Sequence, residues 1–201
     1  MFDGTLPHLI RMTVRDVLTV QHRYQVSGEG YSFQGIIKRT EGDADENLDH
    51  VLFPCALCID TDIRDGQVIG DPTEGALYAL AEKGGIQVQE FRKNYPRIAS
   101  IPFDSDYKFM ATFHEMKDAD GRAIIRAYVK GAPDVILSRS SFGLLADGSS
   151  KKLTEEDRTK ILGENERIAQ EGLRVLAFAR KDFDPATFVF NSRSNAPDGG
   201  L

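Results

Sequence analysis

Apolar residues along the chain follow two periodicities, one typical of strands and one typical of helices. Short stretches that alternate or run apolar between turn-forming residues predict β-strands. These strands are expected at residues 12–20, 23–26, 36–39, 97–103, 108–115, 123–130 and 173–183. Longer stretches with apolar residues three and four apart predict helices at residues 51–63, 71–85, 133–140 and 154–172.

Residues that begin and end helices support two of these predictions. Asp71 is a good N-cap for the second helix, and Thr154 and Gly172 are a good start and stop for the last one. The polar, Gly-containing segments 64–70 and 144–153 are predicted as a turn and a loop. Strands in meander pairs, with helices inserted between them, predict an α+β fold with a largely antiparallel sheet.

Length and composition favour a single globular domain. The chain has 201 residues, of which 41% are hydrophobic and 28% are charged. We place the domain at residues 12–184, preceded by an N-terminal extension at 1–11. The polar, Gly/Pro-rich stretch at 185–201 is expected to be a disordered tail.

Charge and hydropathy restrict the possible ligands. The net charge is −6 and the pI is about 5.3, so no overall basic field attracts DNA, RNA or anionic lipid. The longest apolar stretches fall short of the roughly 18 residues that a membrane-spanning helix needs. The start, MFDGTLPHLI, lacks the features of a secretory signal. Any phosphate-bearing ligand must therefore be held by a local cluster of positive charge.

Cys55 and Cys58 form a C-x-x-C arrangement with two possible meanings. A zinc site needs about four ligands, and no further Cys or His lies at a suitable spacing, so no metal site is expected. The pair is either redox-active or part of the core on neighbouring turns of an apolar helix, and the second interpretation is favoured.

The stretch YVKGAPD, residues 128–134, joins a predicted strand to a predicted helix. Lys130 ends the strand, and Gly131 leads into a proline that suits the first turn of a helix. The stretch either serves only to end the strand, make a turn and begin the helix, or it forms a phosphate site. The second interpretation follows because a helix N-terminus beside a lysine attracts anions. Lys130 shares its strand face with Arg126 and Tyr128, which predicts a polar face. No Walker loop is present.

Three further stretches carry candidate binding residues. In GDPTEGAL, residues 70–77, Glu74 either completes a capping box worth ~1 kcal/mol or accepts a hydrogen bond from an exocyclic amine. In IPFDSDYKFM, Phe103 is either a core residue or a platform for a base, and Lys108 can reach phosphates. In GLRVLAFAR, Arg174 is either a solvated charge or a phosphate ligand, and Leu176 can line a base.

Taken in order, GDPTEGAL, F-D-S-x-x-K-x-M, KGAPD and G-L-R-V-L-A-F-A resemble the nucleotide-binding domain of P-type ATPases. The earlier segments YQVSGEGYSFQG, PCALC and MTV are similar to the same pattern, so the resemblance covers roughly residues 12–183. The branch it resembles contains the calcium pumps and the sodium/potassium pumps. The heavy-metal branch builds this domain from different motifs.

The resemblance implies a role for each matching residue. Phe103 matches the ring that stacks on adenine, and Glu74, preceded by Thr73, matches the acidic residue near its amino group. Lys108 and Lys130 match the two lysines that line the pocket, and Gly131 follows the second. Arg174 matches an arginine near the phosphates, and Leu176 matches an apolar side chain of the pocket. Asp134 replaces the usual glutamate after KGAP, which shortens a carboxylate and leaves the turn intact.

The resemblance also implies ligands and partners. ATP is the expected ligand and ADP the product to be released, with Mg²⁺ held mainly by a separate phosphorylation domain. The chain then positions ATP for transfer to an aspartate on that domain and supplies no catalytic residue of its own. The expected partners are the phosphorylation and actuator domains of a cation pump in a membrane, for which calcium is the first expectation. The isolated chain is expected to be a cytoplasmic, monomeric domain that binds ATP without turnover.

Two other functions fit parts of the sequence. MFDGTL is similar to the nucleophile loop D-x-D-G-T-L of haloacid-dehalogenase-type phosphatases, but methionine stands where the nucleophile aspartate belongs. Because the pump loop is related to it, residues 1–11 are expected to be either an N-terminal extension or a truncated remnant of the phosphorylation loop. The phosphatase function also needs a parallel α/β sheet, which the strand pattern does not predict. The other alternative is a non-catalytic interaction module in which the motifs serve only as caps and turns.

Overall fold

The computed structural model describes residues 12–42, 47–191 and 196–197. The predicted extension at 1–11 lies outside the described residues, as does the stretch MFDGTL on which the phosphatase alternative depends. Parts of the predicted tail at 185–201 also lie outside them.

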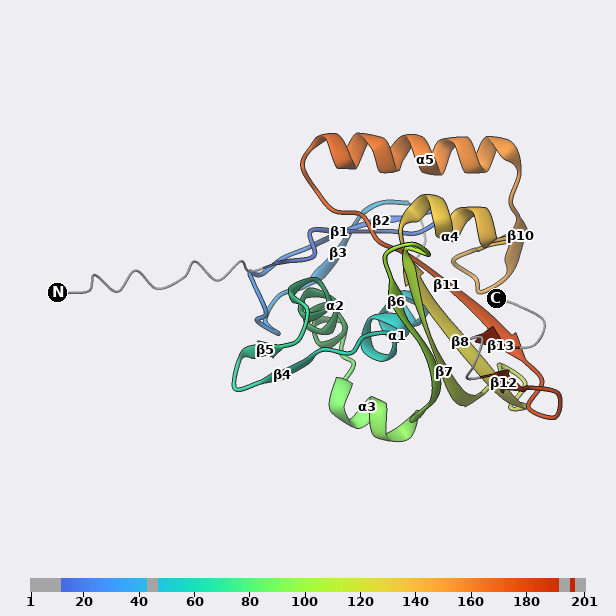
Figure 1. Ribbon diagram of the computed structural model, residues 1–201. Helices are drawn as coiled ribbons and strands as arrows, with labels where there is room; N and C mark the ends of the chain where they lie inside the picture. Colours follow the sequence, from blue (N-terminus) through green and yellow to red (C-terminus); the bar gives the residue numbers. More distant parts are fainter. Residues whose placement is uncertain (1–11, 43–46, 192–195, 198–201) are drawn as a thin grey trace.

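The central feature is a four-stranded antiparallel sheet (Figure 1). Its strands lie in the order β11-β8-β7-β6. Their bounds are Arg97–Asp104 for β6, Phe109–Lys117 for β7, Ala123–Gly131 for β8 and Ala177–Phe183 for β11. The α+β class with a largely antiparallel sheet is therefore confirmed. No parallel pair occurs in the described part of the chain, so the sheet that a haloacid-dehalogenase-type phosphatase needs is not found there.

Smaller sheets surround this one. β1, β2 and β3 form a three-stranded antiparallel sheet, with bounds Asp16–Leu18, Arg23–Val26 and Ile37–Glu41. The other short strands pair two by two: β4 (Asp62–Arg64) with β5 (Gln67–Ile69), β9 (Phe142–Leu144) with β10 (Ser150–Lys152), and β12 (Phe190–Asn191) with β13 (Ala196–Pro197).

The helices of the described residues are α1 (Asp49–Leu57), α2 (Pro72–Lys83), α3 (Val88–Asn94), α4 (Pro133–Arg139) and α5 (Glu155–Gln170). Both predicted helix starts are confirmed. Asp71 accepts hydrogen bonds from the backbone N–H groups of Thr73 and Glu74, and Thr154 forms a capping box with Asp157. No helix in the described part of the chain is both long and apolar enough for a membrane crossing.

Several element predictions were wrong. The helix predicted at 51–63 ends at Leu57. The β4–β5 hairpin follows it, in place of the last part of that helix and the turn predicted at 64–70. Asp65 and Gly66 both have positive φ angles, 51° and 73°, as the tight Asp-Gly turn of a hairpin requires. The hairpin β9–β10 replaces the loop predicted at 144–153, and α3 was not predicted at all.

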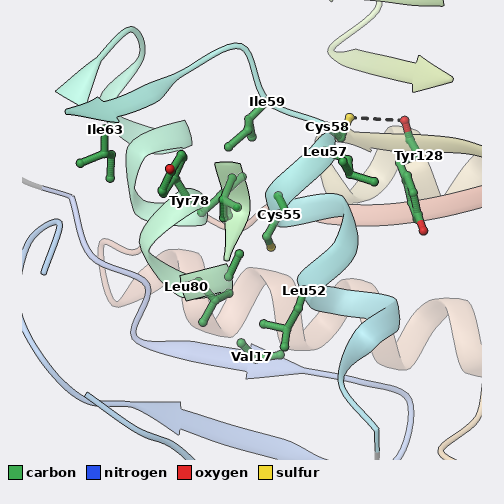
Figure 2. Close-up of a cluster of buried hydrophobic side chains, with 14 of the residues drawn as sticks. Val17, Leu52, Cys55, Leu57, Cys58, Ile59, Ile63, Tyr78, Leu80 and Tyr128 are labelled. Atoms are coloured by element: carbon green, nitrogen blue, oxygen red, sulfur yellow. Dashed lines mark hydrogen bonds between the residues drawn. The ribbon is translucent and has the colours of Figure 1, made fainter. Parts of the chain in front are cut away.

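One face of the main sheet packs on α1, which in turn packs on α2. The buried residues of this α1-side core are Val17, Tyr24, Val26, Leu52, Cys55, Ala56, Leu57, Cys58, Ile59, Ile63, Leu77, Tyr78, Leu80, Ala81, Val88, Met110, Met116 and Tyr128. Figure 2 shows α1 entering this cluster, with Cys58 opposite Tyr128 of β8. The face that carries Tyr128 and Lys130 is therefore buried, and the prediction of a polar face on β8 was wrong, because α1 covers it.

Both cysteines belong to this core. Each is 0% exposed and free, and the Cys58 thiol donates to the backbone oxygen of Tyr128 at 3.3 Å. Burial raises the pKa of Cys55 to about 12 and that of Cys58 to about 11. Since a thiolate is the reactive form, the core interpretation is confirmed and the redox interpretation is not supported.

The opposite face of the sheet packs on α4. The buried residues of this α4-side core are Ile101, Phe109, Ala111, Phe113, Ile125, Ala127, Val129 and Ile136. Phe188 and Phe190 pack against the same core, and their ring centroids lie 5.6 and 5.3 Å from that of Phe113. Both residues belong to the stretch that was predicted to be a disordered tail.

His114 of β7 is a buried neutral base. Its Nδ1 lies 2.9 Å from the backbone oxygen of Tyr95, so Nδ1 carries the proton in the neutral ring. Nε2 has no partner, and the residue is 1% exposed. Burial, opposed by the bond to Tyr95, lowers the pKa of His114 to about 4.

Acid should therefore destabilise the fold through His114. Its folded pKa of about 4 lies below the ordinary 6.5, so the unfolded chain binds more protons between these values. The resulting stability is present above pH 6.5 and is lost as the pH falls toward 4, by roughly 3 kcal/mol in all. Urea unfolding of the wild type and of His114→Asn, which keeps a donor near Nδ1, measures this. Equal pH slopes in the two proteins between pH 6.5 and 4.5 would contradict the assignment.

Candidate functional site

Strand register brings three connecting segments to one end of the main sheet. Gly131, the last residue of β8, pairs with Phe109, the first residue of β7, and with Ala177, the first residue of β11. The β6–β7 turn, the turn into α4 and the segment before β11 therefore meet at this end (Figure 1). The predicted residues Phe103, Lys108, Lys130, Gly131 and Leu176 all lie in or beside these segments.

Lys130 and Glu74 form an ion pair that joins β8 to the first turn of α2. Lys130 Nζ lies 2.5 Å from Glu74 Oε1, and the two side chains are 7% and 14% exposed. Neither side chain projects freely into solvent. A buried pair of this kind offsets its desolvation only when further hydrogen bonds satisfy the remaining polar atoms.

Those further hydrogen bonds come from the segment between α1 and β4. Glu74 Oε2 accepts from the backbone N–H groups of Asp60 at 2.7 Å and Thr61 at 3.0 Å, and from the Thr61 hydroxyl at 3.0 Å. The carboxylate is thereby fixed from one side by this segment and from the other by Lys130. Sequence reasoning did not identify Asp60 or Thr61, since no motif in the chain marks them.

A second link joins the β6–β7 turn to the turn into α4. The Ala132 N–H donates to the Lys108 backbone oxygen at 3.0 Å, and Lys108 has a positive φ of 56°. A Cβ on Gly131 would lie only 2.3 Å from that same oxygen. Gly131 is therefore required because the backbone of Lys108 passes directly over it. This contact sets the position of Lys108 relative to Lys130.

Phe103 is exposed at the same end of the sheet. It lies where the β6–β7 register is irregular, between the pairs Ile101–Ala111 and Asp104–Phe109. Its side chain is 63% exposed, so it is not a core residue. Neighbouring strands are about 4.8 Å apart, which puts β6 about 10 Å from β8 across β7. An aromatic face is thus available within one nucleotide length of Lys130.

Arg174 and Leu176 precede β11 instead of lying in it. The predicted strand at 173–183 begins only at Ala177, so the predicted alternation does not apply to residues 173–176. Arg174 is exposed, and its Nη1 donates to Thr73 Oγ1 at 3.1 Å, which ties it to the start of α2. Leu176 is half-buried and packs against the α1-side core.

Thus the structure links the predicted residues into one neighbourhood. Lys130 contacts Glu74, Arg174 contacts Thr73, and Gly131 contacts Lys108. Exposed Lys108, exposed Arg174 and exposed Phe103 belong to segments at this end of the sheet, a combination that suits a base bearing phosphates. Among the described residues, no group of three or more His, Cys, Asp or Glu side chains is placed to hold a metal ion.

A separate hollow of about 280 Å³ lies elsewhere, lined in part by Arg92, Arg97 and His114. Its arginines already donate to backbone oxygens at the C-terminal end of α1, including those of Ala56 and Leu57. They satisfy carbonyls that a helix end leaves without partners. We therefore assign this hollow a structural role.

The chain belongs to the family described as P-type ATPase, cytoplasmic domain N, which matches residues 47–198. It is 41% identical over 188 residues to the cation-transporting ATPase pma1 of Synechocystis sp., covering 87% of this chain and 20% of that protein. It is 41% identical over 139 residues to calcium-transporting ATPase 1 of Lactococcus lactis, covering 69% and 15%. A calcium-transporting ATPase of Bacillus subtilis is 36% identical over 177 residues, covering 84% and 19%. The chain thus spans a fifth or less of these relatives.

Breaking the Lys130–Glu74 pair should destabilise the fold more than removing both charges. Glu74→Gln leaves the buried ammonium without its counter-charge, so we expect the free energy of unfolding to fall by about 3 kcal/mol. Adding Lys130→Met to that variant should recover most of the loss, since no buried charge remains. Urea unfolding of the two variants measures the difference. A double variant no more stable than Glu74→Gln would contradict the pairing.

Gly131→Ala should also destabilise the site, because the new Cβ meets backbone that cannot move aside. We expect a loss of about 1–3 kcal/mol in the free energy of unfolding. Gly163→Ala is the matched control: its Cβ meets nothing within 4 Å in the middle of α5, so it should stabilise by about 0.5–1 kcal/mol. Chemical denaturation of both compares them. A neutral Gly131→Ala would show that the contact with Lys108 is unimportant.

Proposed function

We propose that this chain binds ATP and positions it for phosphoryl transfer to an aspartate on another domain of a larger pump. The observation that carries the proposal is that the segments bearing Phe103, Lys108, Lys130 and Arg174 meet at one end of the main sheet. Membership of the cytoplasmic N-domain family supports it. The relatives named above are ATPases.

Each residue has a distinct task in this proposal. The Phe103 ring stacks on adenine, for which its exposure makes it suitable. Lys108 and Arg174 are exposed cations that bind the phosphates, and a guanidinium can do so with two parallel hydrogen bonds. Leu176 provides apolar surface beside the base. The binding is therefore a matter of stacking and charge, with no bond-making group contributed by the chain.

Lys130 and Glu74 form the floor of the proposed site. In Glu74, Oε2 accepts three donors, whereas Oε1 accepts only one, from Lys130. A carboxylate oxygen has about two lone pairs, so Oε1 can accept one further hydrogen bond, such as one from the amino group of adenine. Thr73 is held by Arg174 at the edge of this floor.

The contribution to catalysis is positional. Holding the γ-phosphate near its acceptor removes an entropic cost worth several kcal/mol of the barrier. Affinity for the isolated chain is expected to be weak, with a dissociation constant on the order of sub-millimolar to millimolar, or about −4 to −5 kcal/mol. Such weak binding suits a domain that must also release ADP.

The activity of the whole pump is part of the proposal. We infer a cytoplasmic domain of an integral membrane protein that hydrolyses ATP to move a cation, with calcium favoured because two of the relatives above are named calcium-transporting. Phosphorylation and actuator domains are the expected partners. Mg²⁺ would accompany the phosphates and be held mainly by the phosphorylation domain.

ATP titration of the isotope-labelled chain, followed by amide NMR shifts, tests the proposal. We expect saturable shifts around Glu74, Phe103, Lys130 and Arg174. Phe103→Ala should weaken binding by ~1–3 kcal/mol while the chain stays folded, because it removes one stacking partner. Phe142→Ala is the control, since Phe142 is 59% exposed on β9, away from the site. Saturable shifts confined to other regions, or no response to nucleotide, would favour a non-catalytic interaction module instead.

A further inference from the structure

The segment that joins α1 to β4 holds the Glu74 carboxylate through hydrogen bonds. We propose that Thr61, in this segment, is a positioning residue that orients Glu74 and, through it, Lys130 for the nucleotide. The inference rests on the proposed function and deepens it, because it identifies what holds the floor of the site in place.

The hydrogen bonds of Thr61 give its hydroxyl a fixed direction. Its Oγ1 accepts from the backbone N–H of Asp71 at 2.9 Å, so its single proton is left to donate. Glu74 Oε2 lies at 3.0 Å and the backbone oxygen of Asp71 at 3.3 Å. The nearer acceptor is also the charged one, and hydrogen bonds to charged groups are the stronger. The hydroxyl therefore donates to Glu74.

Burial makes this hydrogen bond difficult to replace with water. Thr61 is 0% exposed. Gly70, with a φ of +130°, passes so close that a Cβ there would lie 2.5 Å from Thr61 Oγ1. A glycine at position 70 therefore leaves the space that the threonine hydroxyl occupies.

The segment itself is held by two arginines from other elements. Arg92 of α3 donates to the backbone oxygen of Thr61 at 3.1 Å. Arg97 of β6 donates to the backbone oxygen of Ile59 at 2.7 Å and pairs with the Asp60 carboxylate. Since these two arginines fix the segment independently of Glu74, the position of Thr61 determines the position of the Glu74 carboxylate, and not the reverse.

The start of α2 does not depend on Thr61 for its side-chain cap. Asp71 Oδ1 accepts from the N–H groups of Thr73 at 2.8 Å and Glu74 at 3.0 Å. These two bonds are made by the Asp71 side chain alone, and the Thr61 hydroxyl adds only the bond that it accepts from the Asp71 N–H. Its proton is used for the carboxylate that pairs with Lys130.

Thr61→Val, Thr61→Ser and Thr112→Val test the inference. Valine keeps the shape of threonine and removes the hydroxyl, whereas serine keeps the hydroxyl. Thr112 is an equally buried threonine on β7 that lies beside the Cys58 thiol and not in the segment that holds Glu74, so its valine variant is the matched control. For ATP, Thr61→Val should raise the dissociation constant roughly five- to tenfold. Thr61→Ser and Thr112→Val should stay within about twofold of the wild type.

A second readout follows Lys130 without nucleotide. The ¹⁵N signal of its side-chain ammonium, assigned by its disappearance in Lys130→Met, should shift or broaden in Thr61→Val and stay in place in Thr61→Ser. A role confined to stability would lower the midpoint of unfolding and leave both this signal and the ATP affinity of the folded protein unchanged.

Several outcomes would overturn the inference. The first is a folded Thr61→Val variant that binds ATP with wild-type affinity or leaves the Lys130 signal unmoved. The second is a Thr61→Ser variant that binds ATP as weakly as the valine variant. If Thr61→Val and Thr61→Ala both fail to fold, the residue serves the fold and the inference also fails. If the wild type does not bind ATP, the proposed function falls, and the Lys130 signal alone then decides whether Thr61 positions the pair.

Discussion

The buried ion pair between Lys130 and Glu74 is the interaction on which the rest of the site depends. It joins the last residues of β8 to the first turn of α2, two elements that are far apart in the sequence. A pair with so little exposure is stabilising only within a network that satisfies its other polar atoms. The backbone and hydroxyl of the 60–61 segment complete that network, and two arginines hold the segment in turn. The site is thus built outward from one charge pair.

Antiparallel pairing provides the other constraint. Because β6, β7, β8 and β11 run alternately up and down, the turn after β6, the end of β8 and the start of β11 meet at one edge. A hydrogen bond of 3.0 Å from the Ala132 N–H to the Lys108 backbone oxygen then fixes two of these segments against each other. Rigid strands therefore set the separation between an exposed ring and several cations. Such preorganisation reduces the entropy that ligand binding must overcome.

Sequence patterns predicted the regular parts of this fold well and its irregular parts poorly. Strands with clear alternation and helices with strong caps, such as those begun by Asp71 and Thr154, lie where they were expected. The β4–β5 hairpin was missed although Asp65-Gly66 is a typical hairpin turn, because its flanking strands have only three residues each. Motif order grouped the site residues, yet it could not show that Glu74 is held by backbone N–H groups. Such contacts leave no trace in side-chain identity. Thr61, whose hydroxyl also contacts Glu74, was missed because it lies in no motif of the chain.

The two buried cysteines can report on local separation of α1 from the main sheet without any introduced label site. Both thiols are 0% exposed, the Cys58 thiol lies against the backbone of β7 and β8, and burial raises the pKa of both well above the ordinary value. Alkylating reagents attack thiolates, so labelling of Cys58 requires that the end of α1 first separate from β8. The rate of alkylation therefore reads out the free energy of that separation without any engineered probe. Since Lys130 is the last residue but one of β8, the same separation would release the Lys130–Glu74 pair, and a nucleotide bound at the proposed site would slow the labelling.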